Sequence, residues 1–201
     1  MCSRYAEGSG SAAKLNKIRS LAFLSPTKLI IADKDNHCLR LIEFATNPPS
    51  TTRFAGTCET SGFMHGQRLS NAQLVFPSST AISSNKSIVY FIDNRGKGFR
   101  EINLESDEVR LLKTFSEPLA ELLFYNNALY AIVDSVKVIK INVETFSNEI
   151  IAGGNVAGNT TGLFSKTRLR SALALICWPD SQEELFLVAD RGNKRFDKTS
   201  N

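Results

Sequence analysis

The chain has 201 residues, of which 42% are hydrophobic and 22% are charged, and its formal net charge is +4. This composition is typical of a folded globular chain and excludes an intrinsically disordered one. No stretch approaches the roughly 20 consecutive apolar residues that cross a bilayer, so we expect no membrane insertion.

A short apolar run that ends in aspartate occurs four times along the chain. The four copies are Leu29–Asp33, Val89–Asp93, Tyr130–Asp134 and Phe186–Asp190. The closing aspartates are 60, 41 and 56 residues apart. Periods of 20 to 50 residues are typical of proteins built from repeated small units, so we interpret the two longer intervals as repeats that carry insertions.

A turn and a second apolar strand follow the aspartate in the best copies. Asp33 is followed by Asn36-His37 and by Arg40, and Asp93 is followed by Arg100 at the same distance of seven residues. Because turns of this kind reverse the chain between paired strands, each copy predicts a β-hairpin.

A glycine-rich segment lies upstream of the strands in three of the repeats. It reads Ala55-Gly56, His65-Gly66 and Leu74 to Pro77 in the clearest copy, and part of it recurs as Ala152–Gly154. Only its second half is present near the N-terminus, around Gly8, so we expect the chain to begin within a repeat.

The period-2 patterns and the apolar runs together predict an all-β chain with no helix longer than one turn. The predicted strands are Ser20–Leu24, Lys28–Ala32, Cys38–Glu43, Thr51–Ala55, Ser79–Ser83, Ile88–Ile92, Phe99–Asn103, Glu108–Lys113, Glu121–Tyr125, Ala128–Val133, Lys137–Asn142, Asn148–Ala152, Ala172–Cys177 and Leu185–Ala189.

In the order and spacing of these motifs, the chain resembles the NHL repeats, whose units form four-stranded blades of a β-propeller. The resemblance covers residues 1–201, with blade strands ending near residues 33, 93, 134 and 190, and it implies an incomplete arc whose two terminal blades are truncated. Rings of this family usually hold about six blades, within the four to eight of propellers in general. We therefore expect that further blades or self-association close the ring.

Two of the repeats depart from the family pattern. The third, around Asp134, lacks the Asn-His step, and the last has Asp197 where the pattern places arginine. Residues at equivalent repeat positions are interpreted as structural. These are Asp33, Asn36, His37, Asp93, Asp134, Asp190 and Asn193.

The basic residues next to two neighbouring strand ends are the predicted binding residues, namely Arg40, Arg95, Lys97 and Arg100. With only His37 and His65 as histidines, and no nucleophile or phosphate-binding motif, the sequence predicts no metal site, no cofactor and no catalytic residues. Cys38 and Cys58 are close enough in sequence to form a disulfide across one connection between blades, or else both remain free thiols.

The predicted function is that of a non-catalytic binding scaffold that presents propeller rim loops to a protein partner. One alternative is RNA binding through a basic propeller face, as in the NHL propellers of some tripartite-motif proteins. Another is a propeller-type lyase or hydrolase fragment. The compartment is open: the sequence as written indicates the cytosol, whereas a piece of a secreted or membrane-anchored protein would be extracellular.

Overall fold

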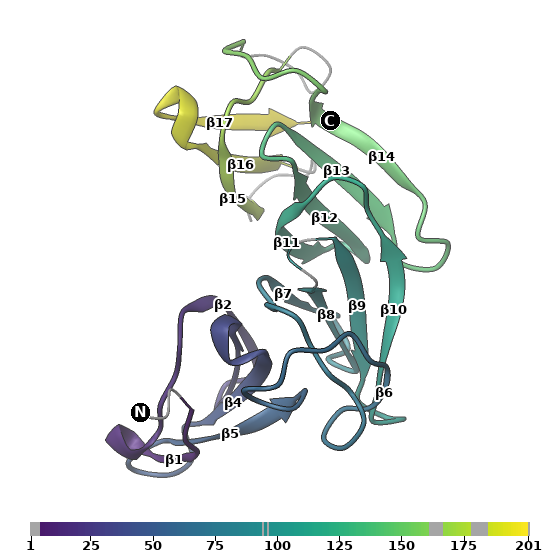
Figure 1. Cartoon of the computed structure of the whole chain (residues 1–201). Helices are drawn as coiled ribbons and strands as arrows, with labels where there is room; N and C mark the ends of the chain where they lie inside the picture. The colour runs from purple at the N-terminus through teal and green to yellow at the C-terminus, as the bar shows by residue number, and fades with distance from the viewer. Residues whose placement is uncertain (1–4, 94, 96, 161–166, 178–184, 201) are drawn as a thin grey trace. The chain divides into compact units, whose positions relative to one another are not determined.

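The structure, a computed structural model, describes residues 5–93, 95, 97–160, 167–177 and 185–200. These residues form four antiparallel sheets (Figure 1). The chain divides into two compact units, Met1–Ser116 and Glu117–Asn201, with two sheets in each.

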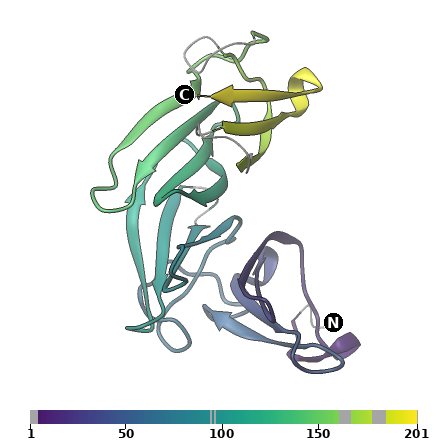
Figure 2. The same ribbon diagram turned by 180° about the vertical axis from the view of Figure 1, so that it is seen from behind.

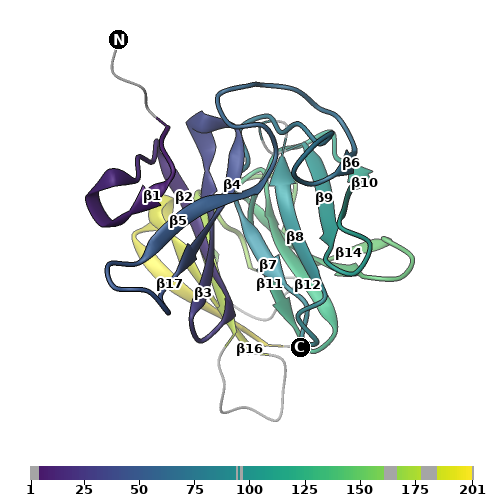
Figure 3. The ribbon, with the colours of Figure 1, turned by 90° about the horizontal axis from the view of Figure 1, so that it is seen from below.

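The first unit contains two five-stranded sheets of the same design. Each is a meander in which successive strands pair, and a two-residue strand from the upstream segment is added beside the last strand, as Figure 3 shows for β6 beside β10. The first sheet comprises β1 (Gly8–Ser9), β2 (Ile18–Ser25), β3 (Lys28–Asp33), β4 (Cys38–Glu43) and β5 (Ser50–Ala55), and the second comprises β6 (Gly66–Gln67), β7 (Thr80–Ile82), β8 (Ile88–Asp93), β9 (Gly98–Asn103) and β10 (Glu108–Thr114).

The second unit contains a four-stranded and a three-stranded sheet. The third sheet comprises β11 (Leu119–Tyr125), β12 (Ala128–Val133), β13 (Lys137–Asn142) and β14 (Asn148–Gly153), and the fourth comprises β15 (Ala172–Cys177), β16 (Leu185–Asp190) and β17 (Arg195–Ser200). Strand β17 lies at the edge of its sheet (Figure 2).

The second strand of each meander explains the apolar runs of the sequence. Strand β12 is buried along its whole length, and β3 is buried from Leu29 to Asp33. A strand covered on both faces needs apolar side chains at consecutive positions, because neither face meets water. β-Branched residues such as Ile30 and Ile31 suit this pleated environment.

Each unit has its own hydrophobic core between its two sheets. In the first unit, Ile30 and Leu39 of the first sheet meet Phe91 and Ile102 of the second. In the second unit, Tyr130 of the third sheet packs against Phe186 of the fourth, with 4.4 Å between ring centroids. Neither sheet of a pair can bury its apolar face alone, so the two stabilise each other.

The segments that lead into the first strand of each sheet differ in length. Residues 56–79 lead to β7 and residues 154–171 lead to β15, whereas only residues 115–118 lead to β11. We call residues 5–17, which precede β2, the first long link. Residues 56–79 are the second long link, and residues 154–171 are the third. The insertions predicted from the aspartate spacing therefore lie in the links.

Every strand predicted from the sequence is present, with ends that differ by at most three residues. The helical elements found among the described residues are three-residue 3-10 turns, at Gly10–Ala12, Lys34–Asn36 and Arg191–Asn193. Within the described part of the chain, no helix has the length and apolar character needed to cross a membrane.

Candidate functional site

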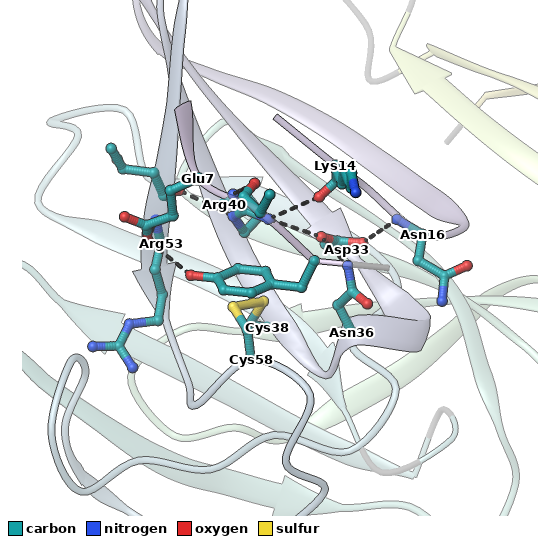
Figure 4. Close-up of a disulfide and its surroundings, with 12 residues drawn as sticks. Glu7, Lys14, Asn16, Asp33, Asn36, Cys38, Arg40, Arg53 and Cys58 are labelled. Atoms are coloured by element: carbon teal, nitrogen blue, oxygen red, sulfur yellow. Dashed lines mark hydrogen bonds and ion pairs between the residues drawn. A yellow bond between two sulfur atoms is a disulfide. The ribbon is translucent and has the colours of Figure 1, made fainter. Parts of the chain in front are cut away.

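A buried aspartate and arginine pair holds the first long link against the first sheet (Figure 4). Asp33 accepts hydrogen bonds from the Asn16 backbone N–H at 2.7 Å and from the Asn36 side chain at 2.8 Å. Arg40 donates to Asp33 at 3.2 Å and to the carbonyl oxygens of Lys14 and Ala6. Both charged side chains are fully buried. They supply the hydrogen bonds that backbone N–H and carbonyl groups of the link would otherwise make to water.

The second sheet repeats the aspartate and arginine contacts with the link. Asp93 accepts from the Val75 backbone N–H and from Arg100, each at 2.7 Å. Arg100 also donates to the carbonyl oxygens of Gln73 and Met64. Tyr5 lies against the Arg40 guanidinium, and Phe63 lies against that of Arg100, with ring centroids 4.5 and 4.8 Å away. We call each such assembly a link clasp.

The position of Arg40 and Arg100 corrects the prediction that they belong to a binding patch. Both side chains are fully buried and are bonded to the links, so neither can contact a partner. The sequence pattern located them in the hairpin, but the side-chain direction follows from the alternation of β4 and β9, which turns them towards the link.

The fourth sheet has a link clasp with a different arginine. Asp190 accepts from the backbone N–H groups of Arg170 and Ser171 and from Asn193. Burial raises the pKa of Asp190, but these hydrogen bonds outweigh it and lower that pKa below its ordinary value. Arg195 donates to the carbonyl oxygen of Thr160.

Thr160 pairs with Arg168 as Ala6 pairs with Lys14 in the first link. Arg195 therefore donates to the link at Thr160 as Arg40 does at Ala6, from a position two residues earlier in the hairpin, but its side chain is partly exposed. The substitution at Asp197 thus removes the expected arginine without removing the clasp.

Asp134 is the exception among the four aspartates, and its prediction as an equivalent capping residue is wrong. Strand β12 ends at Val133, which pairs with Lys137, whereas β3 ends at Asp33, which pairs with Cys38. Asp134 is exposed and has a left-handed φ of 49°. The hairpin is one residue shorter, so Asp134 lies in the turn.

The exposed predicted residues Arg95 and Lys97 lie at the tip of the hairpin between β8 and β9. The Arg95 guanidinium is 5.2 Å from the centroid of the Phe76 ring, and the Lys34 ammonium of the first sheet's hairpin is 6.0 Å from the same centroid. Both distances fall within the range of cation–π attraction. The His37 ring contacts Phe76 at 4.4 Å. We call these five residues the hairpin-tip patch.

The patch carries excess positive charge. Among the described residues, no carboxylate forms an ion pair with Lys34, Arg95 or Lys97, and the neighbouring Asp35 is paired with Lys17 at 2.6 Å. Unpaired cations around an aromatic face form a local positive field that attracts anionic groups.

Backbone strain marks the centre of the patch. Phe76 has φ = 52° and precedes Pro77, although a residue before proline normally adopts an extended conformation. The Phe76 N–H donates to Nδ1 of His37 at 3.2 Å, which fixes the position of both rings. Burial lowers the pKa of His37 below its ordinary 6.5, so the ring is held neutral as an acceptor.

Cys38 and Cys58 are joined by a disulfide, with 5.1 Å between their Cα atoms. The bond attaches the second long link to the base of the first sheet's hairpin, one residue from His37. Asn36 takes part in the same contact, because its carbonyl oxygen accepts the Glu59 N–H at 2.8 Å. The hairpin and the link are therefore fixed to each other on either side of His37.

No group of three or more His, Cys, Asp or Glu side chains that could hold a metal ion occurs among the described residues. His65 lies beside Arg100, 3.3 Å from its guanidinium, within the second link clasp.

The succession of four antiparallel meanders is that of a β-propeller, and the protein has this all-β fold. The solved structures that resemble this chain include the three that follow. An auxiliary nutrient binding protein from Bacteroides ovatus is 11% identical with a TM-score of 0.69, and the match covers 94% of this chain and 47% of that one.

The WD40 β-propeller domain of Doa1 is 12% identical, with a TM-score of 0.56 and coverage of 92% and 52%. Saccharomyces cerevisiae Sqt1 is 15% identical, with a TM-score of 0.60 and coverage of 92% and 46%. The chain thus spans about half the length of these structures. No family model matches the sequence, and neither does any curated protein.

Proposed function

We propose that this chain is a non-catalytic β-propeller scaffold with NHL-type repeats, and that it binds an acidic segment of a protein partner through the hairpin-tip patch. The unpaired cations around Phe76 are the observation that carries the proposal. Rim loops of a rigid propeller are a common site of recognition. The sheets hold the loops in place, and the loop residues are not needed for the hydrophobic core, so their sequence is free to suit a partner.

The chemistry of the patch favours an acidic peptide. A guanidinium donates two parallel hydrogen bonds to a carboxylate, and Lys34 and Lys97 add further positive charge. The half-buried Phe76 ring offers apolar contact to the aliphatic part of a glutamate side chain. Protein interfaces favour this combination of an aromatic anchor with arginine.

The similar solved structures include a nutrient binding protein and a WD40 propeller, with which the proposed binding role agrees. RNA is the less favoured ligand, because single-stranded RNA needs several aromatic platforms along a basic groove and the patch has one aromatic side chain of this kind.

The disulfide supports an oxidising compartment such as the extracellular space, where such bonds persist.

The test is a titration of a fluorescent poly-glutamate peptide with the protein, followed by fluorescence anisotropy. The charge-reversal variant Arg95→Glu/Lys97→Glu is expected to weaken binding about tenfold, since each surface charge contact contributes up to about 1 kcal/mol. The matched control is Lys28→Glu/Lys86→Glu, which changes the net charge equally at the opposite ends of β3 and β8. It is expected to bind almost as the unmodified chain does.

An oligo-uridine RNA of equal charge distinguishes the two ligand classes. The proposal predicts that unlabelled poly-glutamate displaces the fluorescent peptide, and that the RNA at equal concentration does not displace it. Tighter binding of RNA than of peptide, or equal losses in both charge-reversal variants, would contradict it.

A further inference from the structure

The second sheet covers one face of the first sheet, and on the other face the apolar side chains of the first strand, β2, are exposed. On β2, Ser20 and Leu24 face the second sheet, where the Ser20 hydroxyl lies 2.8 Å from that of Thr80 and Leu24 packs on the shared core. The intervening Leu21 and Phe23 point the other way, and they are 63% and 61% exposed. Phe44 joins them, with its ring 6.3 Å from that of Phe23.

The fourth sheet has the same asymmetry with the opposite face free. Leu175, Phe186 and Val188 pack against the third sheet. Ile176 and Phe196 lie on the other face, because the cross-strand partner of Phe196 is Ala189, one residue from Val188. These two side chains are 56% and 78% exposed.

Within each unit, sheets pack in one order along the chain. In the first unit, the first sheet packs on the second, with β2 beside β7. In the second unit, the third sheet packs on the fourth in the same way, with β11 beside β15. The free face of the first sheet therefore corresponds to the face that the second and fourth sheets use to contact the sheet before them. The free face of the fourth sheet corresponds to the face that the first and third sheets use to contact the sheet after them.

We propose that these two faces bind each other between copies of the chain, the free face of the first sheet of one copy packing on the free face of the fourth sheet of a second. The two faces are complementary in type, and each exposes large apolar side chains that soluble proteins normally cover. Two copies also supply about as much chain as the similar solved structures contain. The contact is heterologous, since it joins two different surfaces.

The first measurement is the mass in solution by light scattering on a size-exclusion column, over a range of loading concentrations. The monomer has a mass of 22.2 kDa, and the proposal predicts that the measured mass rises with concentration to at least twice this value. A chain that stays at the monomer mass at every concentration overturns the proposal.

Two variants test the surfaces, and both change exposed side chains so that the folded chain is retained. Phe23→Glu and Phe196→Glu are each expected to remain monomeric, because each destroys one of the two surfaces of every contact. Ile150→Glu is the matched control, since Ile150 is also apolar and is 52% exposed on β14. It is expected to associate like the unmodified chain.

Mixing the two variants identifies the pairing. Phe23→Glu keeps a good fourth-sheet face and Phe196→Glu keeps a good first-sheet face, so an equimolar mixture is expected to recover one contact and form a dimer. If Phe196→Glu alone associates normally, the first-sheet face pairs with itself and the proposed head-to-tail contact is wrong. Association that survives in both variants, or is lost in Ile150→Glu, also overturns it.

Discussion

Asp33 and Arg40, like Asp93 and Arg100, are charged side chains with no exposed surface. Such pairs are retained where hydrogen bonds satisfy most of both partners. Here both guanidinium groups donate to carbonyl oxygens of the links, Arg40 Nε donates to the Thr52 carbonyl oxygen of β5, and Arg100 Nε is buried without a hydrogen-bond partner. Removing one partner leaves a buried charge without its counterion. The link clasp is thus a residue-level feature on which the stability of the first and second sheets depends.

The change Arg100→Met tests this dependence. It is expected to lower the free energy of unfolding by about 3 to 5 kcal/mol, because Asp93 loses its counterion and the link loses two donors. Urea unfolding monitored by circular dichroism measures the effect. Arg95→Met, an exposed change in the adjoining hairpin, is the control and is expected to alter the free energy of unfolding by less than about 0.5 kcal/mol. Equal small effects would mean that the clasp is dispensable.

The two histidines give the stability a pH dependence. Burial lowers the pKa of both His37 and His65 below the ordinary 6.5, with Arg100 adding to the effect at His65. The unfolded chain therefore takes up protons first as the pH falls. The contribution of the two histidines to the free energy of unfolding is fully present above about pH 6.5 and is lost as the pH falls below this value.

Melting temperatures between about pH 7 and about pH 5 measure this loss, above the range in which carboxyl groups titrate. The double variant His37→Gln/His65→Gln is expected to melt almost independently of pH in that range. An unmodified chain whose melting temperature rises towards pH 5 would contradict the sign.

At the scale of elements, link length and clasp occur together. The first, second and fourth sheets follow long links and have a buried aspartate, whereas the third follows residues 115–118 and has Val133 at that position. A link of four residues has little backbone to satisfy, so no clasp is needed. This explains why the sequence repeat around Asp134 is the weakest of the four.

The apolar runs predicted the strands because each run is long and β-rich, and the predicted β-propeller fold is confirmed. Strands β1 and β6 were not predicted, since two residues that include glycine have no periodicity. Strand β17 was missed because Asp197 interrupts its pattern. Side-chain direction was the harder part: the sequence placed Arg40 and Arg95 in similar hairpins, but only pairing and link contacts show that one is buried and the other exposed.

The disulfide joins two such elements, and its loss is predicted to matter. Because it closes a loop of about 20 residues, reduction is expected to lower the free energy of unfolding by about 3 kcal/mol. Melts with and without reductant measure this change, with Cys177→Ser as the control that leaves it unaltered.

Mapping under non-reducing conditions tests the bond itself. It is expected to recover tryptic peptide Asp35–Arg40 joined to Phe54–Arg68. Separate peptides and melts that are insensitive to reductant would show that both thiols are free.

At the scale of the whole molecule, the surface contains two regions of different chemistry, one cationic and one apolar. The hairpin-tip patch is cationic and rigidly held, and we propose that it recognises an acidic segment. The free faces of the first and fourth sheets are apolar, and we propose that they meet between copies. The two proposals use different residues, so the variants of one leave the other unchanged.

The most direct test of the scaffold proposal is to locate the bound peptide by hydrogen exchange of the backbone amides, with and without poly-glutamate. The account predicts slower exchange around Lys34–His37, Phe76 and Arg95–Phe99, with no change around Lys86, which lies at the other end of β8. Protection centred elsewhere, or no protection at a peptide concentration that saturates binding, would contradict it.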